Sequence, residues 1–256
     1  MTEPRIAGLR PSAMQLSATL ALATVTLLAS GCGQAKPSLG GEASSDALAA
    51  DSIGTCAATD PVIAKAPVVV RADVDGDGAA EDVRMTLLDA THCPNYLFTK
   101  IGSHLVGVNL HHASFTGQDL RAVSIPSRQG QLVVARATHP RGGFQTHLYA
   151  YADKKLAEVT APGGDLPIPF VATDTTGGYV SASCTSNGFV VRQAVVHEPP
   201  GIVFAWDIRE TAYQLDGTTA KPSGTKEIKD NVLDKFLRED YGALVRREMF
   251  TTGCGS

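Results

Sequence analysis

The sequence contains only one tryptophan and few aromatic residues, and it lacks several patterns that mark common classes of function. No run of Lys and Arg occurs and the formal net charge is −4, so a nucleic-acid partner is not expected. No Cys-x-x-Cys pair is present, which argues against a cysteine-based zinc site. The sequence also lacks His-Glu-x-x-His and Gly-x-Ser-x-Gly, which are the usual signatures of zinc proteases and serine hydrolases.

Long apolar runs are also missing, since the longest one, Leu16–Leu28, is interrupted by hydroxyl residues and is too short for a comfortable membrane span. It follows Arg5 and Arg10 and ends in Ala29-Ser-Gly-Cys32, which predicts that residues 1–32 are a signal peptide. An ordinary secretory signal with an incidental cysteine is one interpretation of this end.

The small residues before Cys32 resemble the lipobox of bacterial lipoproteins. The resemblance implies that mature Cys32 carries lipid chains such as palmitate. It also implies that the protein is anchored at the extracytoplasmic face of the bacterial cell membrane.

Residues 33–54 are rich in Gly, Ser and Ala, and they predict a flexible linker. Residues 55–256 are then expected to form one domain, because about 200 residues suffice for a single hydrophobic core. Four cysteines remain in this part, and their even number predicts two disulfides with three possible pairings. We favour Cys56–Cys93 and Cys184–Cys254, because each links segments within one half of the domain.

Short segments that alternate or concentrate apolar residues follow one another from residue 66 onward, with Gly, Pro, Asn and Asp between them. This spacing predicts an all-β domain. Asp216-Gly217 is typical of a hairpin turn, and Val232–Tyr241 has the apolar spacing of one short C-terminal helix. The expected strands are Ala66–Ala72, Asp82–Leu88, His104–His111, Leu120–Ile125, Gln131–Thr138, Thr146–Tyr151, Ile168–Thr173, Gly178–Cys184, Phe189–Val196, Ile202–Tyr213 and Gly224–Lys229.

The most informative stretch reads Asp-Val-Asp-Gly-Asp-Gly-Ala-Ala-Glu-Asp and covers residues 73–82. Alternate carboxylates followed by glycines suit a hard cation such as calcium, which takes six to eight oxygen ligands. An EF-hand would need an acid at position twelve of the loop, where Arg84 stands, and the following residues predict a strand. Asp82 is a spare acid, and a solvated acidic turn without an ion is the alternative.

A loop of this kind that opens into a strand resembles the FG-GAP and VCBS repeats, whose blades are β-propeller-like. The resemblance implies calcium and a partial β-propeller-like or irregular antiparallel β-sandwich. Segment 127–130 stands where a second unit would have its acids. The layout is also similar to small exported lipoproteins of high-GC Gram-positive bacteria. The resemblance implies Asp73, Asp75, Asp77 and Glu81 as metal ligands. The carbonyl of Ala79, at position seven of the loop, is a further expected ligand.

We therefore expect a lipid-anchored, calcium-stabilised β domain that is a non-enzymatic module for an envelope protein, a carbohydrate or another ligand. Tyr149, Tyr151 and Tyr179 are candidates for a sugar-binding face, although strand spacing favours core packing. The alternative is an exported hydrolase with a metal-dependent or His-based site. Its candidate residues are His104, His112, His139 and Asp119.

Overall fold

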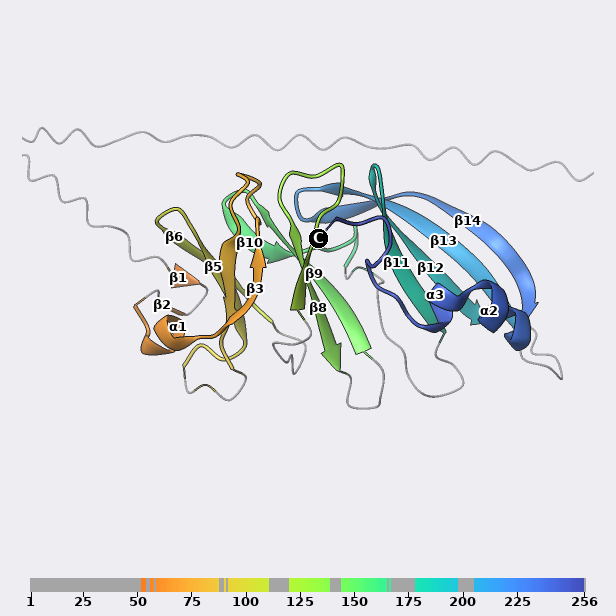
Figure 1. Cartoon of the computed structure of the whole chain (residues 1–256), viewed down its shortest axis with the longest axis horizontal. Coiled ribbons are helices and arrows are strands. Elements are labelled where there is room, and N and C mark those ends of the chain that lie inside the picture. The colour runs from red at the N-terminus through yellow and green to blue at the C-terminus, as the bar shows by residue number, and fades with distance from the viewer. Residues whose placement is uncertain are drawn as a thin grey trace, which may run out of the picture. The chain divides into compact units, whose positions relative to one another are not determined.

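Three four-stranded antiparallel sheets, each built from strands that are consecutive in sequence, form the body of the protein (Figure 1). The all-β fold predicted from the sequence is therefore confirmed. The structure is a computed structural model of the whole chain. It describes residues 52–53, 56–57, 59–87, 90, 92–110, 120–138, 144–164, 166, 178–197 and 205–255.

The sheets are named first, second and third in chain order. The first sheet comprises β3 (Val68–Ala72), β4 (Glu81–Met85), β5 (Tyr96–Ile101) and β6 (His104–Asn109). The second comprises β7 (Leu120–Val123), β8 (Leu132–Thr138), β9 (Phe144–Ala152) and β10 (Lys155–Glu158). The third comprises β11 (Tyr179–Thr185), β12 (Gly188–Val196), β13 (Ala205–Asp216) and β14 (Thr219–Leu233). Outside them lie β1 (Ser52–Ile53), β2 (Cys56–Ala57), α1 (Pro61–Lys65), α2 (Asp234–Asp240) and α3 (Gly242–Val245).

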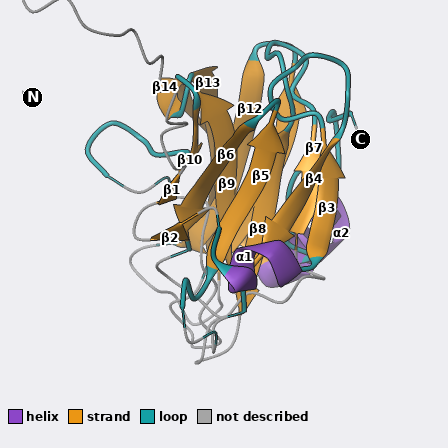
Figure 2. Cartoon of the chain, turned by 90° about the vertical axis from the view of Figure 1, so that its left-hand side faces the viewer, coloured by secondary structure: helices purple, strands orange, loops and turns teal. Residues whose placement is uncertain are grey.

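The sheets stack face to face, and Figure 2 looks through the stack from the side of the first sheet. One core cluster joins the first and second sheets through residues such as Leu97 and Val133. Another joins the second and third sheets through residues such as Val134 and Phe189. Successive residues of a strand point to opposite faces, so Val133 and Val134 enter different cores and the second sheet is covered on both sides.

The pattern of burial along each strand explains which strands could be predicted from the sequence. On β4, Val83 and Met85 are buried while Arg84 is half-buried, which confirms the period of two. The strand β5 was not predicted, because Tyr96–Thr99 is buried without a break. Leu97 enters the core with the second sheet, and Phe98 packs in a cluster with Ile63 of α1. A strand covered on both faces has no polar alternation to detect.

Other boundaries differ from the sequence-based expectation. The short strand β10 was missed, since only Leu156 of its four residues is buried. The predicted strand Gly224–Lys229 is one part of the longer β14. The predicted helix begins later, at Asp234, because Val232 still pairs with β13 as part of the sheet. The predicted strand Ile168–Thr173 lies outside the described residues, and β1 lies within the segment predicted as a linker.

Both favoured disulfides are confirmed. Cys56 and Cys93 are bonded with their Cα atoms 5.4 Å apart, and Cys184 and Cys254 are bonded with theirs 5.0 Å apart. The hairpin predicted at Asp216-Gly217 is also present, with Asp216 opposite Thr219 and Gly217 at a φ of 58°. The second disulfide holds the C-terminal segment against β11.

The C-terminal segment 248–255 runs along two sheet edges. Ala182 of β11 donates its backbone N–H to Glu248 and accepts one from Phe250. Ser124, which directly follows β7, exchanges two backbone hydrogen bonds with Gly255. The end of the chain therefore bridges the edge of the third sheet and the edge of the second sheet.

Candidate metal centre

The acidic turn connects β3 to β4 at one end of the first sheet. Asp73 directly follows β3 and Glu81 is the first residue of β4, so the antiparallel pairing of the two strands brings them together. One carboxylate oxygen each of Asp73, Asp75 and Glu81 can be chosen so that all three lie within 4.8 Å of one another, and the three residues are half-buried. Three of the predicted ligands therefore converge on one point.

The carboxylates also shape the backbone of the turn. Asp73 accepts the N–H of Gly76 at Oδ1 (2.7 Å) and the N–H of Gly78 at Oδ2 (3.1 Å). Glu81 accepts the N–H of Val74 at Oε2 (2.9 Å). Gly76 and Gly78 have φ values of 82° and 92°, which residues with a Cβ rarely adopt. Both glycines thus favour the tight curl of this turn.

Asp77 and Ala79 belong to the same turn but have a different environment. Asp77 is exposed and lies outside the group of three carboxylates. Its Oδ1 accepts the N–H of Ala79 (2.7 Å), while its own N–H donates to Asp75 Oδ1 (3.1 Å). The two residues therefore stabilise the turn, and Asp77 adds negative charge beside the group.

The electrostatics of the turn disfavour the ionised form of one of its acids. Burial raises the pKa of Glu81, the hydrogen bond from Val74 opposes this, and the charges of Asp75, Asp77 and Asp73 raise the pKa further. Like charges this close repel one another unless a cation offsets them. An oxygen-only, partly buried and negatively charged group of this kind fits a hard divalent cation. A bound cation would favour the charged form of Glu81.

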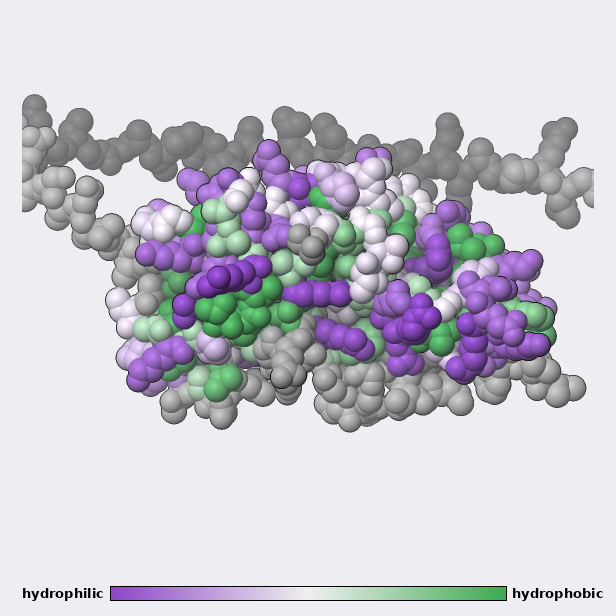
Figure 3. Space-filling view, viewed as in Figure 1, coloured by the Kyte–Doolittle hydropathy of each residue, from purple (hydrophilic) through white to green (hydrophobic). Residues whose placement is uncertain are grey.

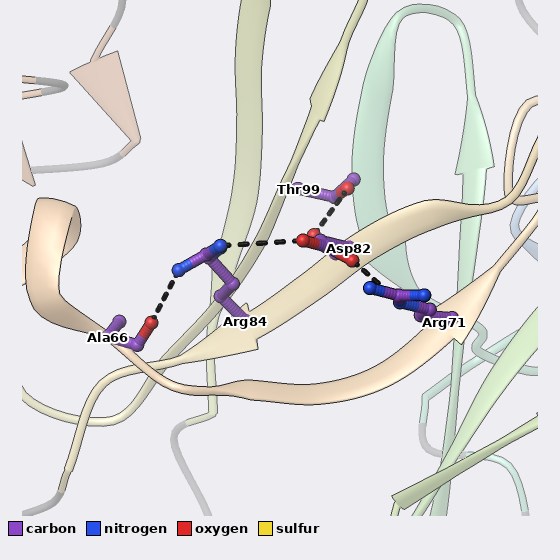
Figure 4. A network of polar contacts seen from close by, with 5 residues as sticks. All are labelled: Ala66, Arg71, Asp82, Arg84 and Thr99. Atoms are coloured by element: carbon purple, nitrogen blue, oxygen red, sulfur yellow. Dashed lines mark hydrogen bonds and ion pairs between the residues drawn. The ribbon is translucent and has the colours of Figure 1, made fainter.

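Asp82 is not the spare ligand that its position in the sequence suggested. Its side chain accepts a hydrogen bond from Arg71 Nε (3.0 Å) and pairs with Arg84 Nη2 at 3.4 Å (Figure 4). Arg84 also donates to the carbonyl of Ala66 (2.9 Å), and Thr99 Oγ1 donates to the Asp82 carbonyl (3.1 Å). Asp82 is thus engaged by two arginines of β3 and β4.

The acidic turn docks on the turn between β7 and β8. The Gln131 N–H donates to the Asp73 carbonyl (2.6 Å), and the Asp73 N–H donates to Gln131 Oε1 (2.9 Å). A Cβ added to Gly130 would lie 2.4 Å from the carbonyl oxygen of Val74, so only glycine permits this approach. Sequence reasoning missed this contact, although it had aligned segment 127–130 with the acidic loop.

The histidine site considered as an alternative is described only in part. His104 lies at the start of β6 and is exposed, while His112, His139 and Asp119 lie outside the described residues. Two other histidines form pairs that the sequence did not indicate. His147 Nδ1 lies 2.6 Å from Glu158 Oε1, and His197 Nδ1 lies 2.6 Å from Asp207 Oδ1.

The tyrosines considered for sugar binding are packed in different places. Tyr149 has an exposed fraction of 1% and belongs to the core between the first and second sheets. Tyr151 packs at the edge of that core. Tyr179 makes an edge-to-face contact with Trp206 at 5.1 Å between ring centroids. They do not form one aromatic face.

Comparison with known proteins finds no match to this chain among protein-family models, curated proteins or solved structures. The similarity to FG-GAP and VCBS loops therefore rests on the residues of the acidic turn. Among the described residues, no helix is both long enough and apolar enough to cross a membrane.

Proposed function

We propose that the protein is a lipid-anchored cell-envelope protein whose β domain is stabilised by calcium and acts as a non-enzymatic binding module outside the membrane. One observation carries this proposal, namely the convergence of Asp73, Asp75 and Glu81 in a half-buried turn. The bound calcium offsets the mutual repulsion of the acids and fixes the entry into β4. Its partner is an envelope protein or a carbohydrate.

Calcium is favoured over zinc by the chemistry of the donors. All three converging side chains are carboxylates, and neither histidine nor cysteine takes part. Zinc sites in proteins are usually built from cysteine and histidine, whereas calcium prefers oxygen. Asp73, Asp75 and Glu81 would hold the ion.

The extracytoplasmic location is supported by two independent features. Disulfides persist in oxidising compartments and are rare in the cytosol, and this chain has Cys56–Cys93 and Cys184–Cys254. The leader ends at Cys32 in a lipobox-like pattern, which is the proposed attachment point for lipid. The linker at residues 33–54 would then separate the β domain from the membrane.

The first test compares Asp75→Asn with the unchanged chain by thermal unfolding, in calcium and after removal of calcium. A ligand present at one hundred times its dissociation constant stabilises a protein by about 2.7 kcal/mol, which corresponds to about 5–10 °C at this size. We expect Asp75→Asn to lose most of this stabilisation in calcium. Without calcium it should melt at the same temperature or higher, because one repelling charge is gone.

The matched control is Asp153→Asn, the same chemical change in the exposed turn between β9 and β10. It should leave the calcium-dependent shift intact. Equal melting curves for Asp75→Asn and the unchanged chain in calcium contradict the proposal. Elemental analysis of the purified protein adds a second check, since zinc in place of calcium would favour the hydrolase.

A further inference from the structure

A cavity of about 320 Å³ lies between the second sheet and residues 246–251, which follow α3 and lead into the C-terminal segment. Its wall includes four arginines and one glutamate among the described residues. Figure 3 shows hydrophilic side chains gathered between the second sheet and α3, on the side of the molecule drawn there. The lining residues are Leu120, Arg121, Val134, Arg136, Thr146, Arg246, Arg247, Glu248, Met249 and Thr251.

Two of the arginines lie on neighbouring strands of the second sheet. Arg121 of β7 pairs with Val134 of β8, and Arg136 lies two residues further along the same face of β8. Val134 belongs to the core shared with the third sheet, so the apolar packing of this face ends where the arginines begin. Burial lowers the pKa of Arg121, and the neighbouring charge of Arg136 lowers it further.

The lining residues outside the second sheet lie within 246–251, just after α3. Glu248 is the only acid among the lining residues, and it already accepts a hydrogen bond from Arg246 Nε (2.7 Å). The Nε of Arg247 is buried and has no hydrogen-bond partner among the described residues. The wall therefore has more positive than negative groups, and its only carboxylate is already paired.

Thr146 provides a second, independent indication of a ligand. It pairs with Arg136 across β8 and β9 and lines the cavity, and its exposed fraction is 5%. Its hydroxyl is buried without a hydrogen-bond partner in the described part of the chain. Burying an unpaired hydroxyl is unfavourable, so a polar group that enters the cavity would gain a hydrogen bond there.

We propose that this cavity binds a small free anion that carries phosphate or carboxylate groups, held by Arg121 and Arg136 and hydrogen-bonded to Thr146. A planar guanidinium group presents paired N–H donors that match a carboxylate or a phosphate. The volume lies at the lower end of the range for small-molecule sites. A bound anion also removes the repulsion between the two arginines.

The site lies apart from the acidic turn and does not depend on the function proposed above. The acidic turn contacts the loop that joins β7 to β8, around Gly130. Arg121 and Arg136 lie toward the opposite end of the same two strands. Anion binding is therefore expected in calcium-free buffer as well as in calcium.

The test is isothermal titration calorimetry of the full chain with inorganic phosphate and with succinate, at constant ionic strength and without calcium. We expect saturable binding of at least one anion. Arg121→Gln should weaken it about tenfold or more, since a hydrogen bond to a charged group is lost. Thr146→Val, which keeps the shape of the side chain, should weaken it about threefold while the ligand-free protein stays at least as stable, because the unpaired hydroxyl is removed.

The control is Arg209→Gln, which removes an exposed arginine from β13 outside the cavity and should change the affinity less than about twofold. The Thr146→Val variant keeps the proposal testable if Arg121→Gln does not fold. Absence of saturable binding by either anion overturns the proposal. A loss of affinity in Arg209→Gln equal to that in Arg121→Gln also overturns it. Vesicles of phosphatidylglycerol are titrated in the same way, and binding to the vesicles but to neither free anion overturns the proposal as well.

Discussion

Two turns lie against each other at the same end of the first and second sheets, and each joins the first two strands of its sheet. The acidic turn between β3 and β4 has carboxylates that accept its backbone N–H groups. The turn between β7 and β8 contains Arg128 instead. Both turns connect the first two strands of a sheet, but the charged side chains that hydrogen-bond in them have opposite sign.

The Arg128 turn is closed by groups of the chain itself. The backbone N–H of Arg128 donates to the carbonyl of Ile125 (3.0 Å), and its Nη2 donates to the carbonyl of Tyr151 (2.7 Å). The acidic turn gathers three carboxylates and leaves Glu81 with a raised pKa. The two turns therefore differ in the charge they gather, and the calcium that we propose would be needed only by the acids of the first turn.

The largest effect is expected where the two turns touch. Gly130→Ala would place a Cβ 2.4 Å from the carbonyl oxygen of Val74, at a φ of 75°. Overpacking and the left-handed backbone together should lower the free energy of unfolding by about 3 kcal/mol. Urea denaturation measures this loss, and the calcium affinity of the acidic turn should fall with it.

Gly78→Ala is the matched control, because Gly78 also has a positive φ but no atom within 4 Å of the added Cβ. It should cost only about 1 kcal/mol. Equal losses in Gly130→Ala and Gly78→Ala would mean that the contact between the turns contributes nothing. If Gly130→Ala leaves the calcium affinity unchanged, calcium binding by the acidic turn does not depend on its contact with the turn between β7 and β8.

An intermediate effect is expected from Arg128→Ala, which removes the donor to the Tyr151 carbonyl. A hydrogen bond from a charged group contributes about 2 kcal/mol when it is partly buried. The loss should be the same with and without calcium, since this turn is closed by protein groups alone. Chemical denaturation under both conditions measures it, and a loss seen only in calcium would contradict the proposed contrast.

The smallest effect concerns the pH dependence of the calcium-free protein. Burial and the three neighbouring aspartates raise the pKa of Glu81 against the hydrogen bond from Val74. A raised pKa in the folded state contributes stability at low pH that is lost as the pH rises through the titration of Glu81. The melting temperature of the calcium-free chain should therefore fall over this range relative to that of Glu81→Gln.

In calcium the stability should instead rise with pH over this range, because a proton and the cation compete for the Glu81 carboxylate. Apparent calcium affinity, measured by titration at several pH values, is expected to rise with pH. A difference between the chain and Glu81→Gln that does not change with pH would show that Glu81 does not titrate in this environment.

Sequence reasoning succeeded where the relevant residues are close together in the chain. The acids at 73–81 lie within one turn, so the alternate spacing of Asp73, Asp75 and Asp77 indicated a cluster of carboxylates. The structure brings Asp73 and Asp75 together with Glu81, while Asp77 lies outside the group. The β4 strand was visible because one of its faces is less buried than the other. Both disulfides followed from the division of the domain into halves.

The arginine cavity could not be predicted in the same way. Its residues come from β7, β8, β9 and the stretch 246–251, and no run of basic residues marks it. Arg121 and Arg136 share a face only because of the register in which β7 pairs with β8. The docking of Asp73 on Gln131 likewise depends on how two sheets stack, which the pattern within each strand does not encode.

The C-terminal segment 248–255 has a consequence for the behaviour of many copies of the protein together. Edge strands offer unpaired N–H and C=O groups to any other chain that can add a strand. On the third sheet these groups of β11 are occupied by the protein's own end, and the bond between Cys184 and Cys254 keeps that end in place. Segment 248–255 therefore covers the β11 edge and disfavours strand addition by another copy of the protein there.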